Sequence, residues 1–149
     1  MSSNTFKHNE RGAALIEFAL AATIFLTAIF AVLEFGRMLW IRNALVDATR
    51  RGARYAVNHN KGSLSDIKEM AVFGNSDGTG TSLINGLTPD HIIVTYSGNW
   101  TVGGGGTVTV EIQNYDFQFV LPFVGTSFRM ADCHTTLPGE NVGLVPNDI

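Results

Sequence analysis

The sequence is poor in cysteine and in charge. Cys133 is the single cysteine among 149 residues, so no disulfide can form within the chain, and a disulfide-stapled mini-protein is excluded. Charged residues make up only 15% of the chain and apolar residues 45%, a balance that excludes a long disordered polymer. A chain of this length suits one modest domain, so a two-domain enzyme is not expected.

The few charges are distributed unevenly along the chain. Residues 1–60 carry seven bases against four acids, for a net charge of +3, whereas residues 61–149 carry three bases against nine acids, for a net charge of −6. The acidic second part argues against nucleic acid as a partner.

Patterns that support catalysis or metal binding are missing as well. The chain has no G-x-S-x-G, no H-E-x-x-H and no clustered carboxylates. Cys133 and His134 form the only Cys/His pair, and one pair cannot make a structural zinc site, so we interpret Cys133 as a buried small residue rather than a ligand. The glycine run 103–106 lacks the Lys-Ser/Thr of a phosphate loop and is interpreted as a hairpin connection. We therefore expect no enzymatic activity, no cofactor and no metal.

One long apolar run dominates the N-terminal part. Residues 13–33 read AALIEFALAATIFLTAIFAVL, with Glu17 as the only ionisable side chain. A helix of this length covers about 31 Å, which matches the roughly 30 Å hydrocarbon core of a bilayer. A buried core helix is the alternative, but a chain of this size has too little material to wrap it. A secretory signal peptide is rejected because the run continues well past the candidate cleavage site at residues 19–21.

The helical pattern continues beyond the apolar run to about residue 57. Apolar or small residues recur there at spacings of three and four, on one stripe: Met38, Ile41, Leu45, Ala48, Gly52 and Tyr55. Polar residues occupy the other side: Asn43, Asp47, Arg50, Arg51 and Arg54. The pattern predicts a single helix of about 45 residues, half in lipid and half carrying a head; a break at Gly36 is the alternative.

The remainder predicts a small α+β head. A short helix is expected over residues 64–73, capped by Ser63 or Ser65 and closed by Gly74, followed by a loop over residues 75–86. Strands are expected over residues 91–97, 107–115 and 127–135, forming an antiparallel meander covered by the stripe on the long helix.

Glu17 is the outlier of the apolar run. Insertion scales assign a carboxylate inside a membrane span a cost of about 2.5–3.5 kcal/mol, so Glu17 should have a partner, be protonated, or lie near enough to the interface to be hydrated. The span itself has no positive charge. A partner would have to come from another molecule or from a newly made terminus.

Two groups of residues carry a family resemblance. Residues 10–18, ERGAALIEF, resemble the processing site of type IV pilin-like proteins, in which cleavage follows a glycine and a glutamate is fifth in the mature chain; Glu17 is fifth when counted from Ala13. The segments EFGR at 34–37, NAL at 43–45 and RGARYA at 51–56 resemble TadE-like minor pseudopilins of the tight adherence pilus system. The resemblance is close over residues 9–57 and only general in the rest.

The resemblance implies a set of functional residues. A prepilin peptidase would cut between Gly12 and Ala13, Glu17 would pair with the free amino group of a neighbouring subunit, and Phe18 would complete the Glu-Phe element. The implied partners are membrane lipid, other pilin and minor pseudopilin subunits, and the peptidase. Many relatives have a proline where this chain has Thr23, so a kink in the anchor is less expected.

The resemblance also implies a division of the chain and a location. Residues 1–12 would be a cytoplasmic leader, 13–33 a transmembrane helix, 34–60 the extramembrane amphipathic half of the helix, and 61–149 a β-rich periplasmic head. The protein would cross the bacterial inner membrane once, and the assembled pilus would lie at the cell surface. Five arginines follow the span within about 20 residues against two bases before it, so the positive-inside count alone would place the head in the cytoplasm.

Three other functions remain open from the sequence. The chain could be a membrane-anchored periplasmic binding domain that does not polymerise and keeps residues 1–12, or a pseudopilin of a type II secretion system. A tethered periplasmic hydrolase is disfavoured, because no nucleophile with an adjacent base is apparent.

Overall fold

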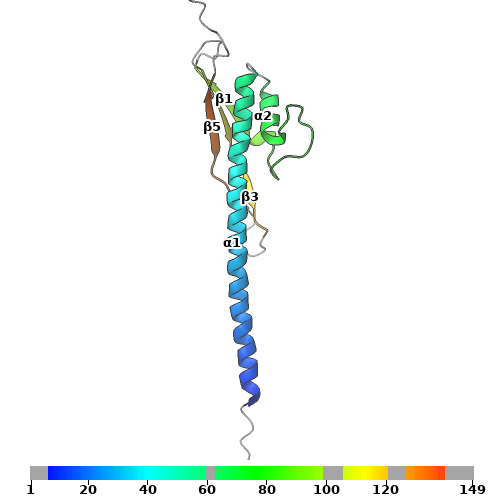
Figure 1. Ribbon diagram of the computed structural model, residues 1–149, viewed down its shortest axis with the longest axis vertical. Coiled ribbons are helices and arrows are strands. Elements are labelled where there is room, and N and C mark those ends of the chain that lie inside the picture. The colour runs from blue at the N-terminus through cyan, green and yellow to red at the C-terminus, as the bar shows by residue number, and fades with distance from the viewer. Residues whose placement is uncertain (1–6, 60–62, 99–105, 121–126, 140–149) are drawn as a thin grey trace, which may run out of the picture.

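A single long helix organises the molecule. The computed structural model describes residues 7–59, 63–98, 106–120 and 127–139, with the side chains of residues 7–11 excepted. Helix α1 runs without interruption over Lys7–Asn58, and the head packs against its C-terminal part (Figure 1). The predicted continuous helix is confirmed, and the alternative break at Gly36 is wrong. The helix begins at Lys7, earlier than the expected start at Ala13.

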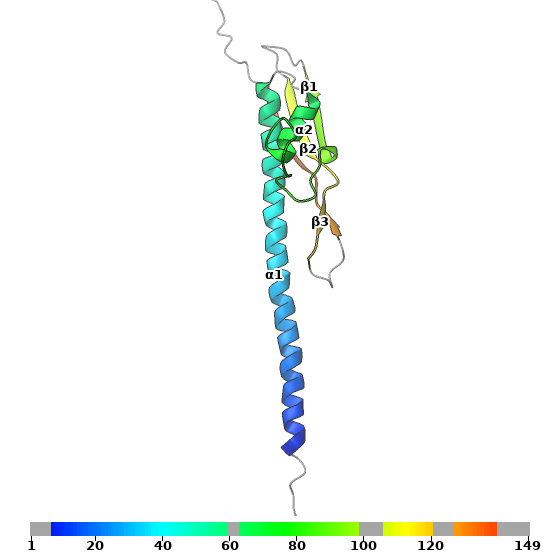
Figure 2. The same ribbon diagram turned by 90° about the vertical axis from the view of Figure 1, so that its right-hand side faces the viewer.

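The predicted stripe on α1 is the face that holds the head. Ile41, Leu45, Ala48 and Gly52 are buried, because the sheet and the second helix cover this side of α1. Figure 2 shows the sheet and the second helix on the same side of the long helix. Burial of this apolar face, rather than helix propensity, holds the head on α1.

Helix α2, Leu64–Phe73, has the predicted bounds. It ends at Gly74, whose φ of 79° is left-handed and whose N–H donates to the Met70 carbonyl. Ser63 is the N-cap residue, as predicted, and its carbonyl accepts from the Ile67 N–H, but its hydroxyl makes no capping bond and instead lies 2.5 Å from the Ser65 hydroxyl. Helix α2 buries Ile67, Ala71 and Val72 in the core that it shares with α1 and the sheet.

The main sheet has three antiparallel strands in the order β1-β2-β5. They are β1 (Ile92–Ser97), β2 (Thr107–Ile112) and β5 (Cys133–Pro138). Strand β2 alternates as predicted, with Val108, Val110 and Ile112 buried. The expected first residue of β1, His91, instead ends a short 3-10 turn, η1 (Pro89–His91), because Pro89 starts that turn. The predicted antiparallel sheet covered by the helix is confirmed.

A second, two-stranded sheet was not predicted. It consists of β3 (Asp116–Gln118) and β4 (Ser127–Arg129), and it lies beside α1 below the main sheet (Figure 1). The expectation of one strand over residues 127–135 is therefore wrong, because β4 pairs with β3 and β5 pairs with β2. The change of sheet follows a turn at Asn114, whose φ of 59° is left-handed, a conformation that asparagine tolerates.

The N-terminal part of α1 stands clear of the head. We call residues 12–33 the shaft; almost all of its side chains are exposed. Among the described residues, α1 is the one helix long and apolar enough to cross a membrane, and none of its most apolar window is buried. A core helix of a soluble domain would be covered, so that alternative is wrong here. The bare shaft indicates single-pass membrane anchoring.

Candidate anchoring and assembly site

The four residues predicted to act in processing and assembly lie together at the start of the shaft. Gly12, Ala13, Glu17 and Phe18 all lie in α1 and are exposed, and a Cβ placed on Gly12 would meet nothing within 4 Å. Ala13 and Glu17 are four residues apart, so they share one face of the helix about 6 Å apart along its axis. The structure thus groups the predicted residues on adjoining turns.

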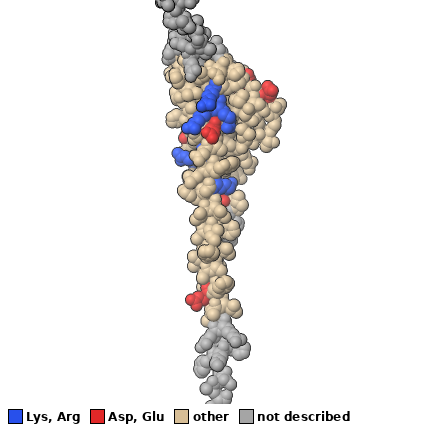
Figure 3. Space-filling view, in the orientation of Figure 1, with Lys and Arg blue, Asp and Glu red and all other residues tan. Residues whose placement is uncertain are grey.

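Glu17 has no countercharge within the shaft. The sequence places no Lys or Arg in residues 12–33, and none of the described side chains forms an ion pair with Glu17. In Figure 3 the basic groups gather over the head end of α1, and the shaft shows none on this face. The three alternatives for Glu17, an outside partner, protonation or hydration near the interface, therefore all remain.

The other polar side chains of the shaft are satisfied within the helix. The hydroxyl of Thr23 donates to the Ala19 carbonyl at 2.8 Å, and that of Thr27 donates to the Thr23 carbonyl at the same distance. Such bonds to the preceding turn let threonine sit in lipid without another partner. Figures 1 and 2 show the N-terminal half of α1 without a sharp kink, in agreement with the absence of proline from the shaft.

A partly buried ion pair ties the head to α1 directly beyond the shaft. Glu34 is only 9% exposed, and its Oε1 accepts hydrogen bonds from Nη2 of Arg37 at 2.5 Å and from the N–H of Val120 at 3.2 Å. The same Arg37 nitrogen donates to the Gln118 carbonyl. The Arg37 guanidinium also lies over the Phe117 ring, 4.3 Å from its centroid. We call this group the clamp: Glu34, Arg37, Phe117, Gln118 and Val120.

The electrostatics of the clamp favour an ionised carboxylate. The hydrogen bond from Arg37 lowers the pKa of Glu34, burial opposes this shift, and the Val120 N–H adds to the lowering. From the sequence alone, the EFGR segment contributed only to the family resemblance. The opposite charges of Glu34 and Arg37, three residues apart, were a local sign that these two side chains could pair. Their other partners, the Gln118 carbonyl and the Val120 N–H, lie more than 80 residues away, and no local pattern reveals them.

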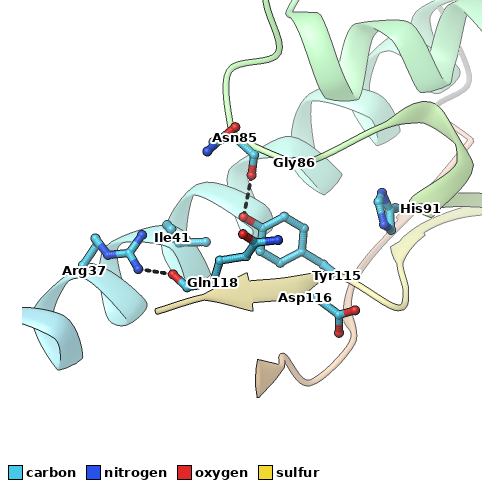
Figure 4. Close-up of a pocket in the computed structure, with 8 residues that line it drawn as sticks. All are labelled: Arg37, Ile41, Asn85, Gly86, His91, Tyr115, Asp116 and Gln118. Atoms are coloured by element: carbon cyan, nitrogen blue, oxygen red, sulfur yellow. Dashed lines mark hydrogen bonds between the residues drawn. The ribbon is translucent and has the colours of Figure 1, made fainter. Parts of the chain in front are cut away.

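A polar cleft of about 250 Å³ lies between α1, the loop ending at Gly86, and β3 (Figure 4). Tyr115 projects into it and donates its hydroxyl to the Asn85 carbonyl at 2.8 Å, and burial raises the pKa of this phenol. Nδ1 of His91 accepts from the Thr88 N–H at 3.1 Å. Asp116 pairs with Arg129 at 3.3 Å. These side chains already have structural partners, so they hold the loop and the hairpin in place.

Cys133 and His134 point to opposite faces of β5. Cys133 is buried against the core, and His134 is exposed, because neighbouring residues of a strand alternate. Burial raises the pKa of the Cys133 thiol, which keeps it protonated and unreactive. The interpretation of Cys133 as a small core residue is confirmed.

Three of the five arginines after the span serve local packing. Arg37 belongs to the clamp, Arg51 donates to the Ala71 carbonyl of α2 at 3.1 Å, and Arg50 lies 3.5 Å from Asp47. A literal count of positive charge therefore overstates how many arginines are available to set the orientation of the helix.

Comparison with protein families assigns the N-terminal helix. Residues 12–54 match the family model described as TadE-like protein. Over these residues, which all lie in α1, the chain is similar to TadE-like proteins. The match confirms the resemblance seen in the sequence over the shaft, the clamp acid and arginine, and most of the stripe. No curated protein and no solved structure gives a match.

The TadE-like segment ends at Arg54, before α2 and the sheet begin. It associates the chain with components of the tight adherence pilus system. The family match thus covers the part of α1 that enters the membrane and the part that carries the head.

Proposed function

We propose that the chain is a minor pseudopilin of the tight adherence pilus, without catalytic activity of its own. A prepilin peptidase removes residues 1–12, the shaft remains in the bacterial inner membrane, and the head lies in the periplasm. The mature subunit then joins other pilin and minor pseudopilin subunits in a pilus used for surface adhesion. The bare apolar shaft within the TadE-like segment is the observation that carries this proposal.

Packing of shafts provides the assembly step. Lipid tails are as apolar as leucine, so helices in a membrane associate through close packing and matched polar groups rather than through the hydrophobic effect. Cleavage creates an ammonium on Ala13, and Glu17 is the one shaft residue that needs a positive partner. Pairing Glu17 of one subunit with Ala13 of its neighbour offsets the two helices by about 6 Å, roughly one turn. The pair therefore sets the register between subunits.

The position of Gly12 supports cleavage at the predicted junction. The bond between Gly12 and Ala13 lies within a helix, so the peptidase must open that helix locally to reach the bond. Glycine lowers helix stability by about 1 kcal/mol relative to alanine, and no side chain packs against Gly12. The junction is thus a weak point in the first turns of α1.

Substitution of Glu17 by alanine tests the assembly role. We expect Glu17→Ala to leave the protein in the membrane fraction and to reduce its incorporation into pili strongly. Thr27→Ala is the matched control, because Thr27 is also a polar shaft residue but bonds its own helix. Normal incorporation of Glu17→Ala would contradict the pairing with Ala13.

A non-polymerising anchored binding domain is the competing function. This function predicts that residues 1–12 are retained. It also predicts that Glu17→Ala and Thr27→Ala do not differ in membrane fractionation or in incorporation into pili. With Ala13 and Glu17 left intact, a disulfide crosslink between Leu20→Cys and Ile24→Cys on separately expressed copies, in a Cys133→Ala background, would support the staggered pairing, because these two exposed positions lie on the same face and are also four residues apart. A crosslink between two copies of Leu20→Cys alone would contradict the offset.

A further inference from the structure

We propose that the β3–β4 hairpin and the residues around α1 at its level rest in the interfacial layer of the bilayer, so that the head itself contacts lipid. We call this surface the interfacial collar. It consists of Phe35, Leu39 and Trp40 on α1, Val120 two residues after β3, and Phe128 on β4.

The clamp fixes the height of the hairpin. Arg37 binds the Gln118 carbonyl, and Glu34 binds the Val120 N–H. From Gln118 to Val120 the chain therefore runs toward the shaft, because its contact on α1 moves from Arg37 to Glu34. Glu34 directly follows the last residue of the apolar run, so Val120 lies level with the edge of the span.

The collar is apolar and uncovered. Val120 is 75% exposed, Trp40 65% and Phe128 53%, and Phe35 and Leu39 are also exposed. Successive helix residues are about 100° apart, so the α1 members point to sides of the helix other than the side that holds the clamp. Apolar side chains are thus exposed at this level on α1 and on the side of the molecule that holds β3 and β4, with the half-buried Arg37 between them.

Lipid is the occupant that this geometry fits. The collar continues the surface of the shaft, and Trp40 lies only about 10 Å beyond Leu33 along the helix, close to the depth of the headgroup layer. Tryptophan is enriched at that layer. Exposed charges begin just above it, with Arg42 on α1 and the Asp116–Arg129 pair at the upper end of the hairpin.

This inference rests on membrane anchoring by the shaft and not on processing, polymerisation or the side of the membrane that holds the head. The test uses the full chain with Cys133→Ala as background. An environment-sensitive fluorophore is placed at Val120→Cys or Phe128→Cys, and Asn58→Cys is the control, since Asn58 is exposed and lies about 36 Å farther along α1 than Glu34.

Each labelled protein is reconstituted at one subunit per lipid nanodisc, with lipids spin-labelled near the headgroup. We expect a blue shift and loss of fluorescence at positions 120 and 128, and neither change at position 58. Equal, weak quenching at all three positions would overturn the proposal. A blue shift that appears only when several subunits share a nanodisc would mean that a neighbouring subunit covers the collar. That result would also overturn the proposal.

Trp40 provides a second measurement without a label. In Trp100→Phe, Trp40 is the only tryptophan, and lipids brominated at shallow depth should quench its emission. An unquenched Trp40 in protein that co-floats with vesicles would contradict the collar while leaving the anchor intact. Failure to co-float would instead contradict the membrane anchoring that the proposed function shares.

Discussion

The carboxylate of Glu34 accepts the backbone N–H of Val120 at 3.2 Å, across 86 residues of sequence. Glu34 is the first residue after the apolar run. Val120 lies two residues after β3, at the end of a described segment that runs beside α1. This contact joins the membrane-facing helix to the lowest part of the head. The head is thus held at two levels, by the stripe above and by the clamp below.

Removal of the Glu34 carboxylate should loosen the hairpin and leave the main sheet intact. We expect Glu34→Ala to reduce the local stability of the hairpin by about 1.5–3 kcal/mol, the usual range for hydrogen bonds to a charged group. Hydrogen exchange of the Val120 amide should accelerate by a factor of ten or more. Asp47→Ala is the control, because Asp47 is also three residues before an arginine on α1 but is exposed, and we expect about 0–1 kcal/mol there.

Acid should weaken the same contact. The pKa of Glu34 is lower in the folded protein than in the unfolded chain, so its ionised form contributes stability above the usual glutamate pKa of about 4.3, and that contribution is lost as the pH falls below it through the folded value. Exchange of the Val120 amide, corrected for its intrinsic pH dependence, should rise on acidification. Glu34→Gln should lack this step; an identical step in that variant would assign the titration to another group.

Gly52 is required by the close approach of α1 to α2. A Cβ there would lie 3.2 Å from Cβ of Ala71 and 3.3 Å from Cγ1 of Val110. We expect Gly52→Val to destabilise the head by about 1–3 kcal/mol through overpacking, as measured by thermal unfolding in detergent. Gly36→Ala is the control, since that position is open, and the change should stabilise the helix by up to about 1 kcal/mol. Equal effects of the two variants would contradict the packing.

Leu45 is the largest stripe residue that is fully buried. We expect Leu45→Ala to lower the free energy of unfolding of the head by about 2–5 kcal/mol, because it removes apolar contacts and leaves a cavity. Leu39→Ala removes the same atoms from an exposed site on the same helix and should change the unfolding of the head little. A small effect at Leu45 would show that the stripe does not hold the head.

The parts of the fold that repeat along the sequence were predictable. The apolar run was recognisable from its length and composition. The stripe from Met38 to Tyr55 and the alternation of β2 were recognisable because each places apolar residues on one face at a fixed period. Helix α2 also had clear ends, because a glycine follows it directly. The structure confirms these elements, since local pattern and tertiary packing agree there.

The hairpin and the clamp could not be predicted from local pattern. Strand β3 is only three residues long, and residues 127–135 read as one strand although Met130 separates two ladders. The Met130 N–H donates to the Tyr115 carbonyl, which continues the β3–β4 register by one residue, and the chain pairs with β2 only from Cys133 onward. Glu34 and Arg37 were visible as a charged pair, but their long-range partners are backbone groups, which carry no sequence signal.

The N-terminus of the protein recovered from membranes tests the central claim most directly. Intact-mass measurement and N-terminal sequencing should give a chain that begins at Ala13 and co-purifies with the membrane fraction, and a glycine substitution such as Gly12→Val should leave the leader attached. A wild-type chain that keeps residues 1–12 in cells that assemble pili would contradict processing at this junction, and with it the pairing of Glu17 with a new amino terminus.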